Sequence, residues 1–229
     1  MSVVKIGGKK RWNAGTFGIA AFACLIAATG CSSSTPAASS APPITVNSRA
    51  TAASALLLMT QADVQAVDGL GGVTASEIKD VPLDQNPDQR GPCGAVVPQA
   101  PTIGATGRDF TATSAEVIEL ISADGAGQEA FLSALQADHH EGCGNYTGVT
   151  KAGATQVVTH IAFVDLKSLG VPSIAWTSVV AANKIAVFAG VFVLDVKGHQ
   201  LFVQIESSVQ ITDAMMKALA TTALHRANG

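Results

Sequence analysis

The chain has 229 residues, with 14 Lys and Arg against 17 Asp and Glu and a formal net charge of −3 at neutral pH. Four of the basic residues and none of the acidic ones precede Cys31, so the chain from Cys31 onward carries a charge of about −7. This balance argues against a nucleic-acid partner and against electrostatic docking on anionic lipid, because both need a basic surface.

The first 30 residues are typical of an export signal. Basic residues at positions 5–11 precede an apolar run over 14–28, which has the length of a signal-peptide core and is too short to span a bilayer comfortably. The run ends in Ala-Thr-Gly directly before Cys31, and this ending resembles a bacterial lipobox. The resemblance implies that residues 1–30 are a lipoprotein signal peptide and that lipid on Cys31 holds the protein at the extracytoplasmic face of the cell membrane. The alternative is an ordinary secreted protein in which Cys31 is incidental.

Two regions follow the signal. Residues 31–50 are rich in Ser, Thr, Ala and Pro and have almost nothing to bury, which predicts a flexible tether. Residues 51–229 are long enough for one domain with a full core but not comfortably for two. Their pattern predicts a single α+β domain, an antiparallel β-sheet meander with helices packed on it.

The cysteines of the domain form an even pair. If Cys31 carries lipid, Cys93 and Cys143 remain, and export places them in an oxidising compartment. Both are flanked by glycine in segments that look like loops. A Cys93–Cys143 disulfide is therefore predicted, and two buried free thiols are the alternative.

Two helices are expected in the first half of the domain. Thr60 followed by Asp63 has the form of a capping box and predicts a short helix, after which 73–81 reads as a strand. A second helix is predicted from Asp124 to about His140. Its apolar stripe consists of Phe131, Ala134 and Leu135.

Strands dominate the rest of the domain. Residues 108–121 are predicted as one long strand with Phe110 and Val117 buried. A meander follows over 156–166, 173–180, 184–196 and 200–207. The run 185–194 is apolar at every position, so it is either a central strand covered on both faces or a strand that lines an apolar cavity. A final helix from about Thr212 is expected to pack through Met215, Ala218, Leu219 and Thr222.

Residue types that carry catalytic or metal chemistry are present in unsuitable patterns. Residues 139–143 contain two histidines and a cysteine, but adjacent histidines at a helix end point apart, so no metal site is predicted. Motifs for nucleophilic hydrolysis and nucleotide binding are absent from the sequence, and neither a cofactor nor an enzymatic activity is expected. Asp165, Asp195 and Glu206 are candidates for a carboxylate pair across the meander, although charged strand ends are the usual explanation.

One aromatic cluster is a speculative ligand site. Trp176 is most simply a core residue, but it becomes a ligand-stacking candidate if it faces a cleft beside Phe188 and Phe192.

The order of elements also resembles a known family. The segment 57–69, Cys93, the segment 128–135 and Cys143 together resemble the PknH-like extracellular sensor domain, which mycobacteria carry on certain kinases and as free lipoproteins. The resemblance implies a cleft for an unidentified ligand and two disulfides, and this chain has cysteines for the first disulfide only. The expected protein is a lipid-anchored sensor-like domain that binds an unknown small-molecule or protein ligand. A carrier of lipid or another apolar molecule and a protein-interaction scaffold are the alternatives.

Overall fold

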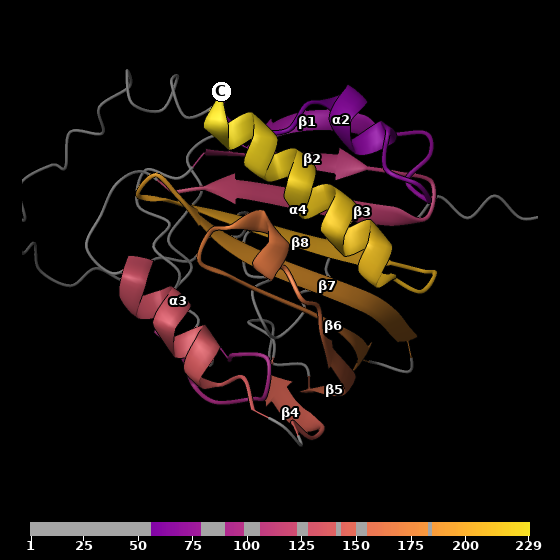
Figure 1. Cartoon of the computed structure of the whole chain (residues 1–229). Helices are drawn as coiled ribbons and strands as arrows, with labels where there is room; N and C mark the ends of the chain where they lie inside the picture. Colours follow the sequence, from indigo (N-terminus) through magenta and orange to yellow (C-terminus); the bar gives the residue numbers. More distant parts are fainter. Residues whose placement is uncertain are drawn as a thin grey trace, which may run out of the picture.

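The computed structural model describes residues 56–78, 90–98, 106–122, 128–140, 143–149, 155–182 and 185–229, and these residues form one α+β domain. Its centre is an eight-stranded antiparallel sheet in the order β1-β2-β3-β8-β7-β6-β5-β4, which runs from the top to the bottom of Figure 1. The strands are β1 (Thr74–Ile78), β2 (Thr106–Thr111), β3 (Ala115–Ile121), β4 (Tyr146–Val149), β5 (Thr155–Phe163), β6 (Ser173–Ala182), β7 (Ile185–Val196) and β8 (His199–Ser207). The predicted fold class is confirmed.

Three α-helices and one turn of 3-10 helix complete the described part of the chain. The helices are α2 (Gln61–Gln65), α3 (Gln128–Ala137) and α4 (Asp213–Asn228), and the 3-10 turn is η1 (Lys167–Leu169). Thr60 and Asp63 form the predicted capping box at the start of α2. None of the helices in this part of the chain is long and apolar enough to cross a bilayer. The export signal, the tether and the expected helix start at Asp124 lie outside the described residues.

The prediction of one strand over 108–121 is wrong, because the segment is the hairpin of β2 and β3. Phe110 and Val117 are both buried, and residues seven apart in one strand would point to opposite faces of a sheet. A turn at 112–114 resolves the conflict by placing Phe110 directly opposite Val117 across the two strands. The turn is held by hydrogen bonds from Thr113 N to Gly71 O at 3.0 Å and from Ala112 N to Ala115 O at 2.8 Å.

The meander from β5 to β8 is close to the prediction. Lys197 and Gly198 form the tight hairpin between β7 and β8, and both have positive φ, as a two-residue turn of this kind requires. β5 has a register shift between Thr159 and Ala162, where exposed His160 also has a positive φ. β7 lies between β6 and β8 and is buried on both faces from Ala189 to Leu194, so this part of its apolar run is that of a central strand, whereas Ile185 and Ala186 are exposed.

The helices divide the sheet into two faces, which we call the α4 face and the α3 face. On the α4 face, α2 and α4 cover the side of the sheet that bears Phe110, Val117 and Phe192. On the α3 face, α3 packs against Ile174 and Trp176, near the start of β6. Figure 1 shows α4 crossing the sheet and α3 beside its lower half.

The packing of α4 differs from the prediction. Met215 and Leu219 are buried as expected, but Ala218 is exposed and Thr222 is only partly buried. The buried stripe continues instead through Met216, Ala220, Ala223 and Ala227. Small residues along this stripe let the helix approach the sheet closely.

Candidate binding face

α3 covers only one part of its face of the sheet. Its buried Phe131, Leu132 and Leu135 pack with Ile174, Trp176, Val191, Val193 and Phe202 in one apolar cluster. Farther along the same face, Val158, Val180 and Ala189 form a separate small cluster with Tyr146 packed against it. The buried apolar side chains of this face therefore extend beyond the part that α3 contacts.

A small depression lies where these two clusters meet, and all of its lining residues except Tyr146 are buried. It is lined by Tyr146, Val158, Trp176, Ser178, Val180, Ala189, Val191 and Gln204. Its volume of about 10 Å³ is roughly that needed for one water molecule. Trp176 is only 2% exposed and forms part of the wall rather than a free stacking platform. The depression therefore has room for about one water molecule and not for an acyl chain.

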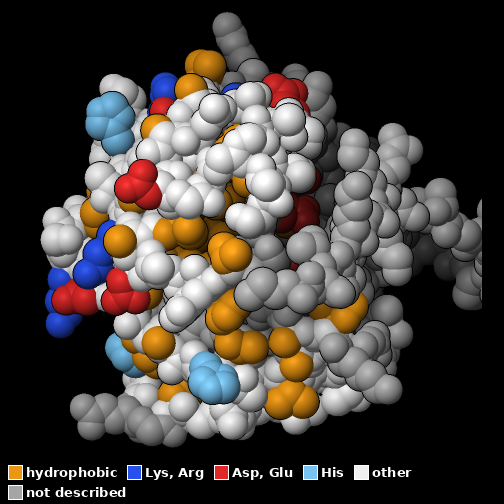
Figure 2. Space-filling view, turned by 90° about the vertical axis from the view of Figure 1, so that its right-hand side faces the viewer, with side chains coloured by type: hydrophobic (Ala, Val, Ile, Leu, Met, Phe, Trp, Pro, Cys, Tyr) orange, Lys and Arg blue, Asp and Glu red, His pale blue; other side chains and the backbone are white. Residues whose placement is uncertain are grey.

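Three carboxyl groups lie on the same face of β8, β3 and β2, beyond Gln204, and we call them the carboxyl cluster. Gln204 lines the depression, and its Nε2 donates a hydrogen bond to Glu206 Oε1 at 2.9 Å. Glu206 on β8 lies directly opposite Glu116 on β3. Asp109 on β2 lies opposite Ile118 and is therefore diagonal to Glu116 on the same face. Figure 2 shows hydrophobic side chains gathered in the lower half of this side of the molecule, with acidic side chains recessed above them.

The carboxyl cluster is partly withdrawn from solvent, and its ionisation is costly. Burial, followed by the charge of Glu116, raises the pKa of Glu206 to about 7, although the hydrogen bond from Gln204 lowers it in part. Burial and the charge of Asp109 raise the pKa of Glu116, and burial raises the pKa of Asp109. Asp109 Oδ1 is buried and has no hydrogen-bond partner. No Lys or Arg of the described residues is among the groups that shift these pKa values.

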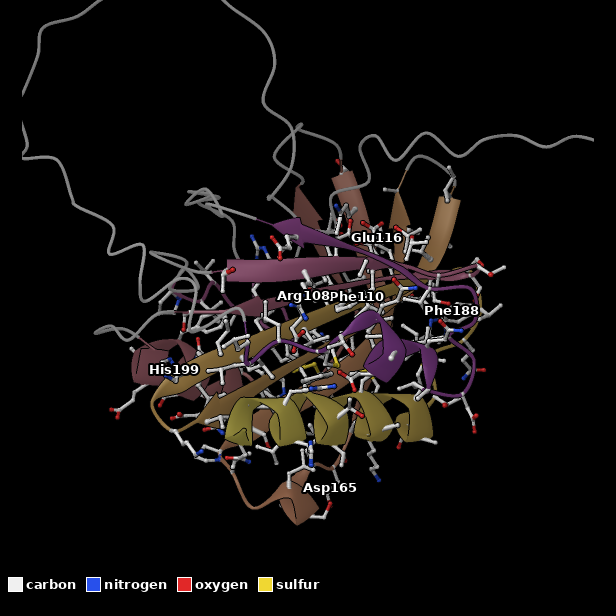
Figure 3. The ribbon with its side chains drawn as sticks, turned by 90° about the horizontal axis from the view of Figure 1, so that it is seen from above. Arg108, Phe110, Glu116, Asp165, Phe188 and His199 are labelled. Atoms are coloured by element: carbon white, nitrogen blue, oxygen red, sulfur yellow. A yellow bond between two sulfur atoms is a disulfide. The ribbon has the colours of Figure 1, made fainter. Side chains whose placement is uncertain are left out.

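The aromatic residues predicted to share a cleft do not lie together. Trp176 belongs to the α3 face, whereas Phe192 is fully buried on the α4 face and Phe188 packs against the same α4-face core. The pairing of Trp176 with Val191 sets this separation, because neighbouring residues of β7 point to opposite faces. Figure 3 shows Glu116 and Phe188 on opposite sides of the sheet, with Phe188 toward α4.

The structure places Glu206 beside a carboxyl other than the candidates Asp165 and Asp195. Asp165 is exposed and accepts a hydrogen bond from Lys167 N at 2.9 Å, and Asp195 lies at the far end of β7. Glu206 is the only member of the predicted set near other carboxyls among the described residues, and its neighbour is Glu116. Sequence reasoning missed Glu116 because the β3–β8 register is a long-range property. The available signal was the presence of two acidic residues, Glu116 and Glu119, among the apolar residues of this strand.

The disulfide between Cys93 and Cys143 is present, with their Cα atoms 5.1 Å apart, and confirms the prediction. Asp138, which follows α3 and is buried, accepts hydrogen bonds from Cys93 N at 2.7 Å and Ala95 N at 3.3 Å. The loop bearing Cys93 is therefore joined to Cys143 by a covalent bond and to the residue after α3 by hydrogen bonds from its backbone to the Asp138 carboxylate.

Three residues of the same region have side chains of the kinds that bind metal ions. Cys93, Asp138 and His140 each place one ligand atom within 4.8 Å of the others. The Cys93 sulfur belongs to the disulfide, and the Asp138 carboxylate already accepts two backbone N–H groups. His139 stacks on Phe163 with ring centroids 3.7 Å apart. The oxidised protein thus offers no thiolate to a metal here.

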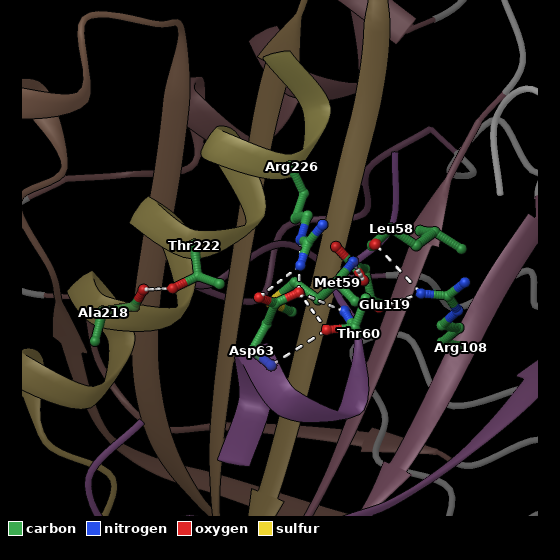
Figure 4. Close-up of polar contacts among 9 residues, drawn as sticks. All are labelled: Leu58, Met59, Thr60, Asp63, Arg108, Glu119, Ala218, Thr222 and Arg226. Carbon is green, nitrogen blue, oxygen red and sulfur yellow. Dashed lines mark hydrogen bonds and ion pairs between the residues drawn. The ribbon is translucent and has the colours of Figure 1, made fainter. Parts of the chain in front are cut away.

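A polar network on the α4 face secures the start of the domain (Figure 4). Glu119 on β3 is fully buried, and its Oε2 accepts a hydrogen bond from Met59 N at 2.7 Å. Arg108, directly opposite on β2, donates to the carbonyl oxygens of Leu58 and Met59. The segment before α2 is therefore held to the sheet by its backbone.

Burial raises the pKa of Glu119 to about 8, against the lowering effects of Met59 N–H and Arg108. The neutral acid is consequently the stable form at neutral pH. The second oxygen, Oε1, has no hydrogen-bond partner.

The overall structure was compared with known proteins. The sequence matches no protein-family model and no curated protein sequence. A solved structure, the extracellular domain of PknH from Mycobacterium tuberculosis, superimposes with a TM-score of 0.53 at 16% identity, covering 76% of this chain and 94% of that one. The chain shares the PknH extracellular-domain fold. An uncharacterized protein from Mycobacterium smegmatis, the Rv0999 ortholog, matches with a TM-score of 0.31 at 9% identity over 53% of this chain and 64% of that one.

The PknH likeness agrees with the resemblance drawn from the sequence. The match covers nearly the whole PknH extracellular domain, so the shared part is an entire domain rather than a few strands. At this identity it establishes the fold, and the chemistry of the face must be argued from the residues of this chain.

Proposed function

We propose that the protein is a lipid-anchored, extracytoplasmic, sensor-like domain that binds a ligand or an envelope partner on the α3 face. The observation that carries the proposal is the depression between the two apolar clusters, beside the carboxyl cluster. An apolar recess next to a few polar groups is the usual composition of a binding site. The fold shared with the PknH extracellular domain and the lipobox-like ending at Cys31 support its placement outside the membrane.

The structure favours this function over the carriage of a lipid. The carrier hypothesis requires one face of β7 to line an apolar cavity, but side chains from both helical layers cover the strand. The depression of about 10 Å³ is far smaller than an acyl chain. The small volume of the recess therefore favours a partner that binds on the surface of this face over an engulfed molecule.

A site-specific crosslinking experiment tests the location of the binding face. A photoreactive phenylalanine analogue replaces Tyr146, which lines the depression, in the full chain expressed in a mycobacterium. The matched control carries the analogue at Lys217, an exposed position of α4 on the opposite face. We expect a discrete adduct from position 146 and none from position 217. Equal adducts from both positions, or none from position 146, would contradict the proposed face.

A further inference from the structure

We propose that the reduced form of the protein binds one zinc ion where the loop bearing Cys93 meets the end of α3. The four ligands are the thiolates of Cys93 and Cys143, one carboxylate oxygen of Asp138 and one ring nitrogen of His140. The ion joins the Cys93 loop to Cys143, as the disulfide does in the oxidised protein, and adds the segment after α3 to the link. This inference is independent of the binding face proposed above.

The ligand atoms are already close together in the oxidised protein. One atom each from Cys93, Asp138 and His140 lies within 4.8 Å of the other two, and the sulfur of Cys143 is bonded to that of Cys93. Ligand atoms around a tetrahedral zinc ion lie roughly 3.3 to 3.8 Å from one another, because each is about 2.0 to 2.3 Å from the metal. Once the disulfide is reduced, rotation of the two cysteine side chains lets the sulfurs separate toward this distance.

The two adjacent histidines point in different directions, and only one of them belongs to the site. His139 stacks on Phe163, with ring centroids 3.7 Å apart. His140 instead places a ring nitrogen near the Asp138 carboxylate. The divergence expected of adjacent histidines at a helix end therefore removes one histidine and leaves the other. One is sufficient, since two thiolates and a carboxylate supply the other three ligands of a four-coordinate zinc ion.

Asp138 is positioned by the loop with which it shares the site. Its buried carboxylate accepts hydrogen bonds from Cys93 N at 2.7 Å and from Ala95 N at 3.3 Å. A carboxylate oxygen has two lone pairs, so each oxygen retains one for a metal. Hydrogen bonds that fix the orientation of a ligand strengthen metal binding. Because His140 is exposed, the site is open to solvent on its side, and the ion has a path of entry.

The chemistry of the ligands selects zinc over the common hard cations. Thiolate and imidazole ligands suit Zn²⁺, whereas Mg²⁺ and Ca²⁺ bind sets of oxygen ligands. Two sulfurs, one nitrogen and one oxygen are a suitable set for a tetrahedral zinc ion and supply too few oxygens for either hard cation.

Zinc binding and the disulfide are alternative states of one link. The two cysteines are thiols whenever the disulfide has not formed, as in the newly made chain. Binding breaks two S–H bonds, forms two Zn–S bonds and releases two protons to solvent, with no transfer of electrons. Oxidation by an external disulfide reverses the link: that disulfide takes two electrons from the thiolates and two protons from solvent to become two thiols, the Cys93–Cys143 bond forms, and the ion leaves.

Cobalt(II) provides the readout, because it occupies tetrahedral zinc sites and absorbs visible and near-ultraviolet light when thiolates bind it. The parent for the test is the full chain carrying Cys24→Ser and Cys31→Ser, in which Cys93 and Cys143 are the remaining cysteines. It is held in a mild nonionic detergent, reduced with a phosphine, separated from the reductant and titrated with Co²⁺ in the absence of oxygen. Zn²⁺ is then added to displace the Co²⁺.

We expect one Co²⁺ per reduced chain, with sulfur-to-cobalt charge-transfer absorption that Zn²⁺ abolishes. The same chain with its disulfide intact should show no such absorption. His140→Ala removes a ligand and should lower the affinity for Co²⁺ at least about tenfold. His139→Ala is the matched control, because it removes the neighbouring ring without removing a ligand, and it should bind as the parent does.

The proposal is overturned if the reduced parent shows no charge-transfer absorption up to about 1 mM Co²⁺, or if the His140→Ala and His139→Ala variants bind Co²⁺ equally. A reduced chain that unfolds would give the second result, because its two thiolates would hold the ion with no preference for either histidine, and it would equally overturn the proposal.

Discussion

Asp63 and Arg226 lie 163 residues apart in sequence and form a two-point ion pair, with Arg226 Nε 2.6 Å from Asp63 Oδ2 and Arg226 Nη2 3.0 Å from Oδ1. The pair joins the first turn of α2 to the last turn of α4. Asp63 Oδ2 also accepts hydrogen bonds from Thr60 N and Thr60 Oγ1, both at 2.7 Å. One carboxylate thus caps its own helix and connects the two ends of the domain.

Removing the cation should destabilise the domain in a pH-dependent way. Burial raises the pKa of Asp63, but the hydrogen bonds from Arg226 and Thr60 outweigh it and bring the pKa down to about 2. Because the folded pKa lies below the unfolded value, this stabilisation is present above pH 4 and is lost as the pH falls through about 2. We expect Arg226→Ala to lower the free energy of unfolding slightly at pH 7, since the pair is partly exposed, and by almost nothing near pH 2. Urea unfolding at both pH values measures this.

Lys217→Ala is the control, because it removes an exposed cation from the same helix without touching Asp63. An equal loss of stability in the two variants, or a loss in Arg226→Ala that persists at pH 2, would show that the ion pair has no specific role.

Glu119→Gln should stabilise the domain at alkaline pH. The pKa of Glu119 is raised from 4.5 to about 8 in the folded protein, so unfolding releases a proton between these values and becomes easier as the pH rises. Glutamine resembles the neutral acid and keeps an oxygen for Met59 N–H. We expect the variant to exceed the parent in free energy of unfolding by on the order of 2 to 4 kcal/mol at pH 8, and to match it near pH 4.5. A pH-independent difference would mean that Glu119 is already ionised in the folded state.

Two glycines of the sheet should differ in their tolerance of alanine. A Cβ at Gly107 would contact Leu120 Cδ2 and lie 2.6 Å from the backbone oxygen of Glu119, which cannot move without disturbing β3. A Cβ at Gly190 would lie 2.7 Å from Met216 Sδ, near the end of a flexible side chain. We expect Gly107→Ala to lower the free energy of unfolding by about 3 kcal/mol and Gly190→Ala by about 1 kcal/mol. Urea titrations that reverse this order would contradict the packing described for β2 and β3.

The disulfide should contribute strongly to stability. It closes a loop with a sequence separation of 50 residues, for which the chain-entropy model gives about 4 kcal/mol. The double variant Cys93→Ala with Cys143→Ala should unfold at correspondingly lower urea. Intact-mass analysis of the unreduced parent after thiol alkylation should show neither of these cysteines labelled. Labelling of both would show that the thiols are free in the cell envelope.

The lipid anchor is tested by cell fractionation. If Cys31 carries acyl chains, the parent should sediment with membranes and gain the mass of the lipid, and Cys31→Ala should abolish both. Cys93→Ala with Cys143→Ala serves as the control, because it removes two cysteines and should leave the protein in the membrane fraction. Unchanged sedimentation of Cys31→Ala would favour another means of attachment.

Local signals predicted much of the fold. The capping box at Thr60, the turn at Lys197 and Gly198, and the even cysteine pair each depend on residues whose chemistry limits the backbone or the pairing. The β2–β3 hairpin was missed although its signal was present, since Phe110 and Val117 have opposite parity in a single strand.

The binding face was less predictable because it depends on register. The side of the sheet on which Trp176 lies follows from its pairing with Val191, and a shift of one residue would have placed it with Phe188 and Phe192. The opposition of Glu116 and Glu206 joins strands that are far apart in sequence. The Glu116–Glu206 pairing is not specified by the residues in a local window, whereas the Trp176–Val191 pairing depends on the exact register of the β6–β7 hairpin, which continues to Ala182 opposite Ile185.

The position of the polar network around Met59 has a mechanical consequence. Tension applied to the chain ahead of Leu57 reaches the domain first through the Met59 to Glu119 hydrogen bond and the Asp63 to Arg226 ion pair. These contacts load β3 and the end of α4, at the opposite side of the sheet from β4 and β5. If the chain is anchored through Cys31, a pull from the membrane would therefore enter the sheet at β3 and at the end of α4, whereas β4 at the far edge of the sheet carries none of these contacts.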